Sequence, residues 1–204
     1  MSKALPVFHL AAKSGLIAAA TAADSVLFAW RNPSTTAVQR LHRLEVIART
    51  VTGFSAAFEN ALEVRDVSDF DGANYSGGTD LSHPSTAANK AYRKISSDVL
   101  IKPPAETVLE SGNVRIATTG ALSHAGSPVI ASHPFAWGAF SELATGATVH
   151  KGGHGFVWEA PEIEHEHVPR VLLPDAGFVI RNPVALAAAG DVRFFVSVLW
   201  SEQK

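Results

Sequence analysis

The feature that most constrains the fold is the alternation of side chains in the closing segment VRFFVSVLW, residues 192–200. Successive side chains of a β-strand point to opposite faces, so this segment divides into two sets. One set is wholly apolar: Val192, Phe194, Val196, Val198 and Trp200. The other set is Arg193, Phe195, Ser197 and Leu199. Because both faces are largely apolar, the segment is expected at the centre of a sheet, and a layered β-fold is the expected class.

Shorter runs of strand-forming residues, bounded by turn residues, precede this segment. The clearest are residues 24–31, 113–118, 128–131, 155–159, 170–173 and 177–181. Residues 38–52 alternate imperfectly, so a helix remains an alternative at their start, and residues 54–67 mix helix formers with an alternating part. Their β-branched or alternating ends favour strands in both. The spacing predicts an all-β fold, an antiparallel β-sandwich of the jelly-roll type with at most one short helix.

We expect a single sandwich domain over residues 24–204, preceded by an N-terminal arm over residues 1–23. A chain of 204 residues lies within the range of one sandwich, and no internal repeat marks a boundary. Residues 68–85 contain Asp-Gly, Gly-Gly and His-Pro, which predict a surface loop. Residues 85–94 begin with a capping residue and end with basic ones, which suits the one short helix.

Composition excludes several classes of protein. With 47% apolar and 18% charged residues, the chain can bury a core and is not expected to be disordered. A net charge of −2 offers no general attraction to nucleic acid or anionic lipid, so neither is an expected partner. The absence of cysteine removes disulfides, thiolate nucleophiles and zinc–thiolate sites.

One apolar stretch near the start, GLIAAATAA at residues 15–23, resembles the core of a signal peptide. Lys13 and Ser14 interrupt the apolar run before it, so we do not expect it to act as one. No stretch approaches the roughly 20 apolar residues that span a bilayer.

Histidines are the first candidates for a metal site. His165 and His167 stand among three glutamates in EIEHEH, and His150 and His154 flank a Gly-Gly pair. Paired imidazoles on one strand face can bind zinc, nickel or iron, which would make the chain a cupin-like metalloenzyme. Metal sites need ligands that converge from separate strands, and spacing alone does not provide them. We therefore expect a solvated strand edge or loop there, with no metal or other cofactor.

Other catalytic patterns are weak. The chain has no Gly-x-Ser-x-Gly elbow, and its Gly-Gly pairs lack the Lys-Ser/Thr of a phosphate loop. Arg40, His42 and Arg43 form a basic cluster, but Glu45 follows and no aromatic residues are interleaved, which favours a solvated strand face over a nucleic-acid site. The sequence therefore predicts that the protein is not an enzyme.

The tryptophans divide into two pairs. Trp30 and Trp200 lie on strong apolar runs and are expected in the core. Trp137 and Trp158 lie beside glycine and proline breaks, which makes them candidates for an interface with another protein. Aromatic residues often dominate such interfaces. The expected interface set, assigned to loops, is Phe135, Trp137, Phe140, Phe156 and Trp158.

Several segments together resemble a family of virion structural proteins encoded in tailed phages and prophages. They are SVLFAWRNPSTTAVQRLHRLEV, TGFSAAFENALEVRDVSDF, GGTDLS, NKAYRKI, VRIATTGALSHAG with HPFAW, LLPDAGFVIRNP and VRFFVSVLW. The resemblance covers much of the chain and implies a role in assembly, without any catalytic residue. It implies a head decoration or cement protein of the virion that binds the major capsid protein and copies of itself, as a homo-oligomer such as a trimer. A tail, baseplate or fibre-associated protein is the alternative, and a cupin-like metal-binding enzyme is a more distant one.

Overall fold

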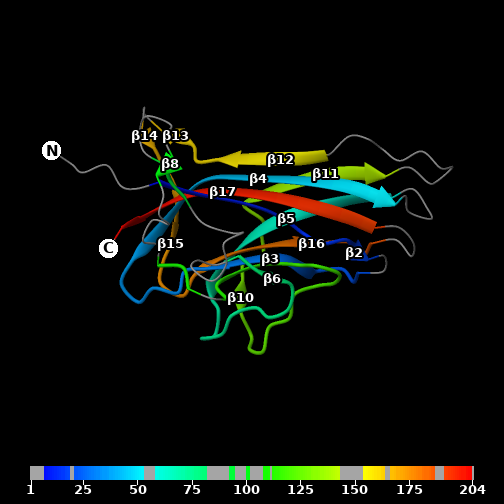
Figure 1. Cartoon of the computed structure of the whole chain (residues 1–204), viewed down its shortest axis with the longest axis horizontal. Helices are drawn as coiled ribbons and strands as arrows, with labels where there is room; N and C mark the ends of the chain where they lie inside the picture. The colour runs from blue at the N-terminus through cyan, green and yellow to red at the C-terminus, as the bar shows by residue number, and fades with distance from the viewer. Residues whose placement is uncertain are drawn as a thin grey trace.

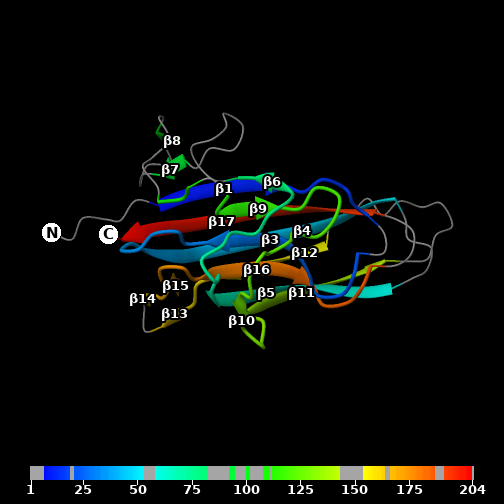
Figure 2. The same cartoon turned by 90° about the horizontal axis from the view of Figure 1, so that it is seen from below.

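The computed structural model describes residues 7–18, 21–52, 58–81, 92–94, 100–101, 108–110, 112–142, 154–163, 166–186 and 191–203. Within these ranges every regular element is a strand and none is a helix. The strands form two antiparallel sheets packed face to face (Figures 1 and 2), together with a separate small hairpin. The all-β sandwich expected from the sequence is confirmed.

One layer, the β4 sheet, has the order β12-β4-β17-β1-β7-β8. Its path consists of β12 (His154–Glu159), β4 (Val38–Thr52), β17 (Asp191–Gln203), β1 (Val7–Lys13), β7 (Tyr92–Lys94) and β8 (Leu100–Ile101). Two short strands join it from outside this path: β15 (Arg170–Leu172) pairs with β4, and β2 (Ile17–Ala18) pairs with β17. Its two longest strands, β4 and β17, lie side by side.

The other layer, the β5 sheet, has the order β10-β5-β16-β3-β9-β6. Its path consists of β10 (Val129–Ile130), β5 (Phe58–Asp69), β16 (Gly177–Asn182), β3 (Ser25–Arg31), β9 (Val114–Ile116) and β6 (Thr79–Asp80). Strand β11 (Ala136–Glu142) also pairs with β5. The separate hairpin consists of β13 (Glu162–Ile163) and β14 (Glu166–His167).

Aromatic side chains from both sheets meet in the core. Trp30 of β3 stacks on Phe178 of β16 with ring centroids 5.9 Å apart. The same indole meets Trp200 of β17 edge-on at 4.7 Å, and Trp200 stacks on Phe8 of β1 at 5.3 Å. Trp30 and Trp200 are 0% and 1% exposed, which confirms that they belong to the core.

A row of hydrogen bonds accompanies these rings. The Trp30 indole N–H donates to Gln39 Oε1 at 2.8 Å, and Gln39 Nε2 donates to Glu202 Oε1 at 3.1 Å. The same carboxylate oxygen accepts from the Trp200 indole N–H at 3.2 Å, while Oε2 accepts from the backbone N–H of Val108 at 2.9 Å. The buried polar atoms of Gln39 and Glu202 are therefore paired, as burial requires.

Strand β17 occupies the central position expected from its alternation. It pairs with β4 on one side and β1 on the other. The side chains from Val192 to Trp200 that face inward are all buried. The opposite face is more open, and Phe195 there is 36% exposed.

A β-bulge explains why the alternation of residues 38–52 is imperfect. Trp200 is opposite Leu41 and Leu199 is opposite Arg43, so His42 is an extra residue on β4. An extra residue reverses the parity of the strand beyond it. Leu41 and Leu44, three positions apart, consequently both face the core and are fully buried. The helix-like spacing in the sequence belongs to a bulged strand.

The N-terminal arm predicted over residues 1–23 differs from the structure over its described part. Residues 7–13 form β1, which pairs along its whole length with β17. Phe8, Leu10 and Ile17 are buried in the core. The alternation of VFHL therefore supplies an inner row of the β4 sheet, and residues 7–18 belong to the sandwich.

The structure differs from two further predictions, the short helix and the loops that were expected to carry the interface aromatics. The helix predicted over residues 85–94 lies outside the described residues except for its last three, which form β7 and pair with β1. The edge of β1 that faces away from β17 provides hydrogen-bond partners for these three residues. Helix propensity is a local property and does not include such partners. Residues 136–142, which carry Trp137 and Phe140, form a strand and not a loop, because they pair with β5. Residues 154–159, which carry Phe156 and Trp158, form a strand paired with β4, as the predicted run at residues 155–159 indicates, although both aromatics were assigned to a loop.

Candidate interaction surface

The predicted interface aromatics gather along one side of the sandwich, where β11 and β12 lie next to each other (Figure 1). Strand β11 carries Trp137 and Phe140 at the edge of the β5 sheet, and Phe135 immediately precedes it. Strand β12 carries Phe156 and Trp158 at the edge of the β4 sheet. We call this side the β11–β12 edge. The side chain of Phe140 is outside the described part of the structure.

The two strands approach each other closely at Gly138. A Cβ atom on Gly138 would overlap the ring of Phe156, so a larger residue there would have to displace that ring. Phe156 is half-buried and packs against the core. Glycine thus lets the two sheets close over Phe156.

Phe135 and Trp158 pack against each other at the same edge. Their rings meet edge-on at 5.5 Å, and the Phe135 ring also meets Phe178 of the core at 6.4 Å. The guanidinium of Arg170 lies 4.1 Å from the centre of the Phe135 ring, within the range of a cation–π contact. Arg170 Nε donates to Asp66 Oδ1 at 2.6 Å, which joins β15 of one sheet to β5 of the other. These aromatics therefore pack within the protein's own sandwich.

Trp137 differs from its neighbours because it is 64% exposed. It stands opposite Glu63 in the register of β11 and β5, whereas the preceding pair, Ala136 and Val64, is buried. Alternation therefore directs the Trp137 indole away from the core, onto the outer face of the β5 sheet. Among the described side chains of the predicted interface set, it is the one that remains largely in water.

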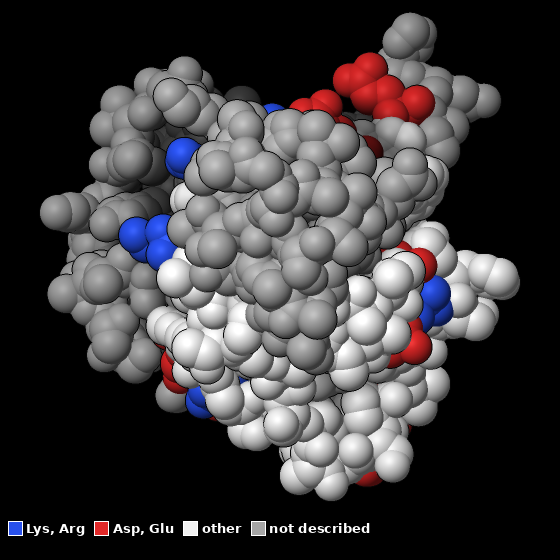
Figure 3. Space-filling view, turned by 90° about the vertical axis from the view of Figure 1, so that its right-hand side faces the viewer, with Lys and Arg blue, Asp and Glu red and all other residues white. Residues whose placement is uncertain are grey.

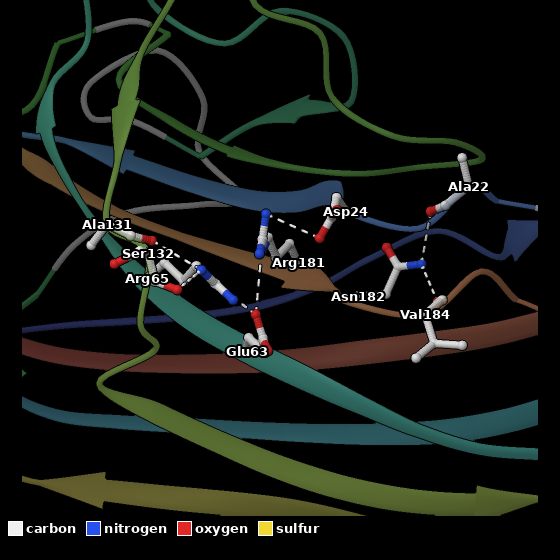
Figure 4. A network of polar contacts seen from close by, with 9 residues as sticks. All are labelled: Ala22, Asp24, Glu63, Arg65, Ala131, Ser132, Arg181, Asn182 and Val184. Atoms are coloured by element: carbon white, nitrogen blue, oxygen red, sulfur yellow. Dashed lines mark hydrogen bonds and ion pairs between the residues drawn. The ribbon is translucent and has the colours of Figure 1, made fainter.

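Glu63, the residue opposite Trp137 on β5, belongs to a network of charged side chains, which Figure 4 shows. Glu63 Oε2 accepts from Arg65 Nε at 2.7 Å and from Arg181 Nε at 3.3 Å, and Arg181 also pairs with Asp24 at 3.0 Å. Burial raises the pKa of Glu63, but the hydrogen bonds and charges of Arg65 and Arg181 outweigh it and hold the pKa below its ordinary value of 4.5. The network fixes three charged groups next to the exposed indole.

The predicted metal ligands cannot be assembled into a site from the described residues. His150 and His165 lie outside the described ranges, and only the backbone of His154 and His167 is described. Among the residues that the structure does describe, no group of three or more His, Cys, Asp or Glu side chains is placed to hold a metal ion.

Two histidine–serine contacts, not singled out from the sequence, lie on the outer face of the β4 sheet. His9 Nε2 is 2.9 Å from Ser197 Oγ, and His42 Nε2 is 2.8 Å from Ser201 Oγ. A serine beside a histidine supports acyl transfer when N–H donors are also free to bind the oxyanion that develops on the substrate. Both serines lie on β17, which pairs with β4 on one side and with β1 on the other. The backbone N–H groups of β17 are therefore used in pairing with these two strands. These two contacts therefore do not indicate a hydrolytic site.

The basic cluster predicted on β4 lies on the same outer face. Arg43 pairs with Glu45 at 3.5 Å and with Glu159 of β12 at 3.2 Å, and Arg40 donates to Gln203 Oε1 at 2.7 Å. The arginines here are bound to neighbouring side chains of the same sheet.

Comparison with known proteins adds no identification. No protein-family model, no curated protein and no solved structure matches the chain. In the described part of the chain, no helix is long and apolar enough to cross a membrane. The phage structural role thus stays a prediction from the sequence.

Proposed function

We propose that this chain is a structural protein of a tailed-phage particle, a head decoration protein that binds the major capsid protein and copies of itself. The proposal is supported by the resemblance of several sequence segments to such proteins and by the kind of surface that the sandwich offers. In this role the protein stabilises an assembly by contact alone, and its mechanism is the burial of apolar side chains between subunits.

The observation that carries the proposal is the exposure of Trp137. Tryptophan is among the residues most enriched in the energetic centres of interfaces, where its large ring is removed from water. The indole is carried by a strand paired along its length with β5, so the backbone at this position is already ordered before binding.

The charged residues near Trp137 suit the polar rim of a protein–protein interface. Glu63, Arg65 and Arg181 have only 15%, 13% and 16% of their side chains exposed, and they are bonded to one another. Such prearranged charges select a complementary partner surface more than they add affinity. Strand β11 also pairs on one side only among the described strands, so its other edge can accept a strand of a partner.

Cryo-electron microscopy of particles from the phage or prophage that encodes the chain tests this function. Density for the sandwich on the capsid lattice, with the β11–β12 edge against the capsid protein, is the expected result. Density at the tail alone would replace the head role by a tail or baseplate role. Absence of the protein from purified particles would overturn the proposal.

A further inference from the structure

The outer face of the β4 sheet carries apolar side chains that the sandwich leaves partly in water. Phe195 of β17 is 36% exposed there, although the inward side chains on either side of it are buried. Ile47 of β4 is opposite Phe195, and Val157 of β12, on the same face, is 49% exposed. The second sheet does not bury this outer apolar row. An exposed apolar surface with a polar border is typical of an interaction with another protein.

A hollow beside Phe195 makes this face uneven. It has a volume of about 410 Å³ and a mainly apolar lining, in which Ala11 of β1 and Ser197 of β17 are small side chains. Phe195 and Ile47 also line it. A large exposed ring and a recess between small residues thus lie side by side. When two copies meet face to face about a two-fold axis, each copy offers its ring to the recess of the other.

Positive charges gather on one half of the face, Lys13, Arg49 and Arg193, which we call the basic half. Arg49 of β4 is opposite Arg193 of β17, and Lys13 of β1 is opposite Phe195 in the next row. Like charges in opposite positions on neighbouring strands destabilise a sheet. Within the described structure, none of the three cations has a hydrogen bond or an ion pair, and Arg193 Nε is buried without a partner. Figure 3 looks onto the end of the molecule where β17 begins and shows several basic side chains on the left.

Carboxylates outnumber the exposed cations on the other half, which we call the glutamate half. Glu159 of β12 is opposite Arg43 of β4 and has a side chain that is 65% exposed, and Glu45 lies one row nearer the middle. Both carboxylates share the guanidinium of Arg43, at 3.2 Å and 3.5 Å. A second hollow, of about 680 Å³, lies on this half, and Glu159 and Glu162 line it. Arg40, the other arginine here, already donates to a side chain of β17.

The two halves lie apart along the strands, so their charges are complementary in only one arrangement of two copies. Arg49 and Arg43 are separated by roughly 20 Å, at about 3.3 Å per residue of strand. A two-fold axis that crosses the strands between the halves reverses the order of the rows in the second copy. The basic half of each copy then faces the glutamate half of the other, and the apolar residues meet between these contacts. An axis along the strands would instead place each arginine near its own equivalent, which repulsion opposes.

We propose that the outer face of the β4 sheet binds the same face of a second copy, so that the protein forms a two-fold dimer. This inference rests on the part of the proposed function that concerns self-association, and it does not require the particle. Four strands spaced about 4.8 Å apart present roughly 450 Å² of flat sheet over the 7 residues of β1. With both copies counted, this area is at the lower limit for a specific interface, so we expect a dimer that dissociates in the micromolar range.

Sedimentation velocity of the purified full chain tests the interface. The wild-type protein is expected to shift from monomer to dimer with rising concentration and to grow no further. Because the charges lie at the surface, added salt should weaken the dimer. Lys13→Glu with Arg49→Glu reverses the basic half, and Glu159→Lys reverses the glutamate half. Each variant should weaken dimerisation about tenfold or more, since attraction becomes repulsion at both contacts.

Mixing these two variants gives the decisive result. In a dimer that contains one copy of each, one contact joins the two reversed surfaces and the other joins two unchanged surfaces. Both contacts are then attractive, so an equimolar mixture should dimerise although each variant alone does not. The substituted side chains are exposed, and unchanged circular dichroism and melting temperature would verify folding. Glu110→Lys, a charge reversal at an exposed site elsewhere, should dimerise like the wild type.

Phe195→Ala tests the apolar centre of the interface separately from the charges. It should weaken the dimer at low and at high salt, whereas Val129→Ala, at an exposed site on β10 of the other sheet, should dimerise like the wild type. A wild-type chain that stays monomeric at low salt, charge variants that dimerise like it, a mixture that stays monomeric, or growth beyond the dimer would each overturn the proposal. None of these outcomes bears on whether the protein occurs on particles.

Discussion

At the scale of single residues, Glu202 illustrates how the core tolerates a carboxylate. It is 7% exposed, and at least three donors point at its two oxygens: the Gln39 amide, the Trp200 indole and the backbone N–H of Val108. Each donor would be left unpaired without it. The carboxylate therefore binds the Trp200 indole directly and is connected to the Trp30 indole through Gln39.

Replacing Glu202 by glutamine is expected to destabilise the fold. The amide NH₂ of Gln would face one of the donors that now bind an oxygen, and a buried donor without an acceptor costs about 1–3 kcal/mol. Urea unfolding of Glu202→Gln measures this cost. Glu110→Gln, at an exposed carboxylate, is the matched control and should leave the free energy of unfolding unchanged. Equal stability of both variants would show that the donors do not depend on the charge.

Glu63 makes stability depend on pH. Because Arg65 and Arg181 lower its pKa in the folded state despite burial, Glu63 stabilises the fold fully at pH values above 4.5. That contribution is lost as the pH falls through the folded-state pKa, since the unfolded chain binds the proton first. The free energy of unfolding of the wild type should therefore fall more steeply below pH 4.5 than that of Glu63→Gln. Parallel curves for the two proteins would contradict the role of the two arginines.

At the scale of elements, the pairing of β3 with β16 depends on one glycine. Gly177 begins β16 opposite Arg31, and a Cβ atom there would overlap the backbone carbonyl of Trp30. The obstacle is backbone and cannot rotate away. The two strands can lie in register at this point only with a hydrogen in place of a side chain.

Gly177→Ala is expected to lower the free energy of unfolding by about 1–3 kcal/mol or more, because β3 and β16 must separate locally. Gly120→Ala is the control, since a Cβ atom at Gly120 meets nothing within 4 Å, and its effect should stay within about 0.5 kcal/mol. Thermal unfolding of both variants provides the comparison. A neutral Gly177→Ala would mean that the strands are spaced differently.

At the scale of the whole molecule, the aromatic residues of the β11–β12 edge differ in role: some pack between the two sheets, and one is exposed for binding. Phe135 and Trp158 close the sandwich, and Trp137 faces outward from a strand between them in sequence. A substitution at each position should therefore have a different consequence, either on folding or on binding.

Trp137→Ala should leave the fold unchanged and weaken association with particles. The indole is 64% exposed, so little packing is lost, whereas removing an interface tryptophan typically costs about 2 kcal/mol of binding, roughly thirtyfold in affinity. Co-sedimentation with particles lacking the protein measures the affinity. Val129→Ala, an exposed apolar site on β10 outside the β11–β12 edge, should bind like the wild type. Loss of folding in Trp137→Ala, or binding equal to the wild type, would contradict the assignment.

The sequence by itself determined the strands whose strand-forming runs are bounded by turn residues, such as residues 25–31 and 177–182, and which side chains of the last strand face inward. Both properties are local: alternation in steps of two follows from the pleat of a single strand and needs no knowledge of its partners. The core positions of Trp30 and Trp200 followed from the same local patterns. Where the period broke, as at His42, the sequence was ambiguous, because a bulge exists only relative to the neighbouring strand β17.

Tertiary structure alone decided which strands pair and what each surface residue contacts. Residues 7–13 entered the sandwich because β17, nearly two hundred positions away, offers an edge for them. Trp137 and Trp158 have similar sequence surroundings, and only the packing of two sheets buries one ring against Phe135 and leaves the other in water. Arg49 of β4 and Arg193 of β17 likewise lie opposite each other only through the register of the two strands. Such pairings depend on which complementary faces meet after the chain has folded back, and no local pattern of residues encodes that choice.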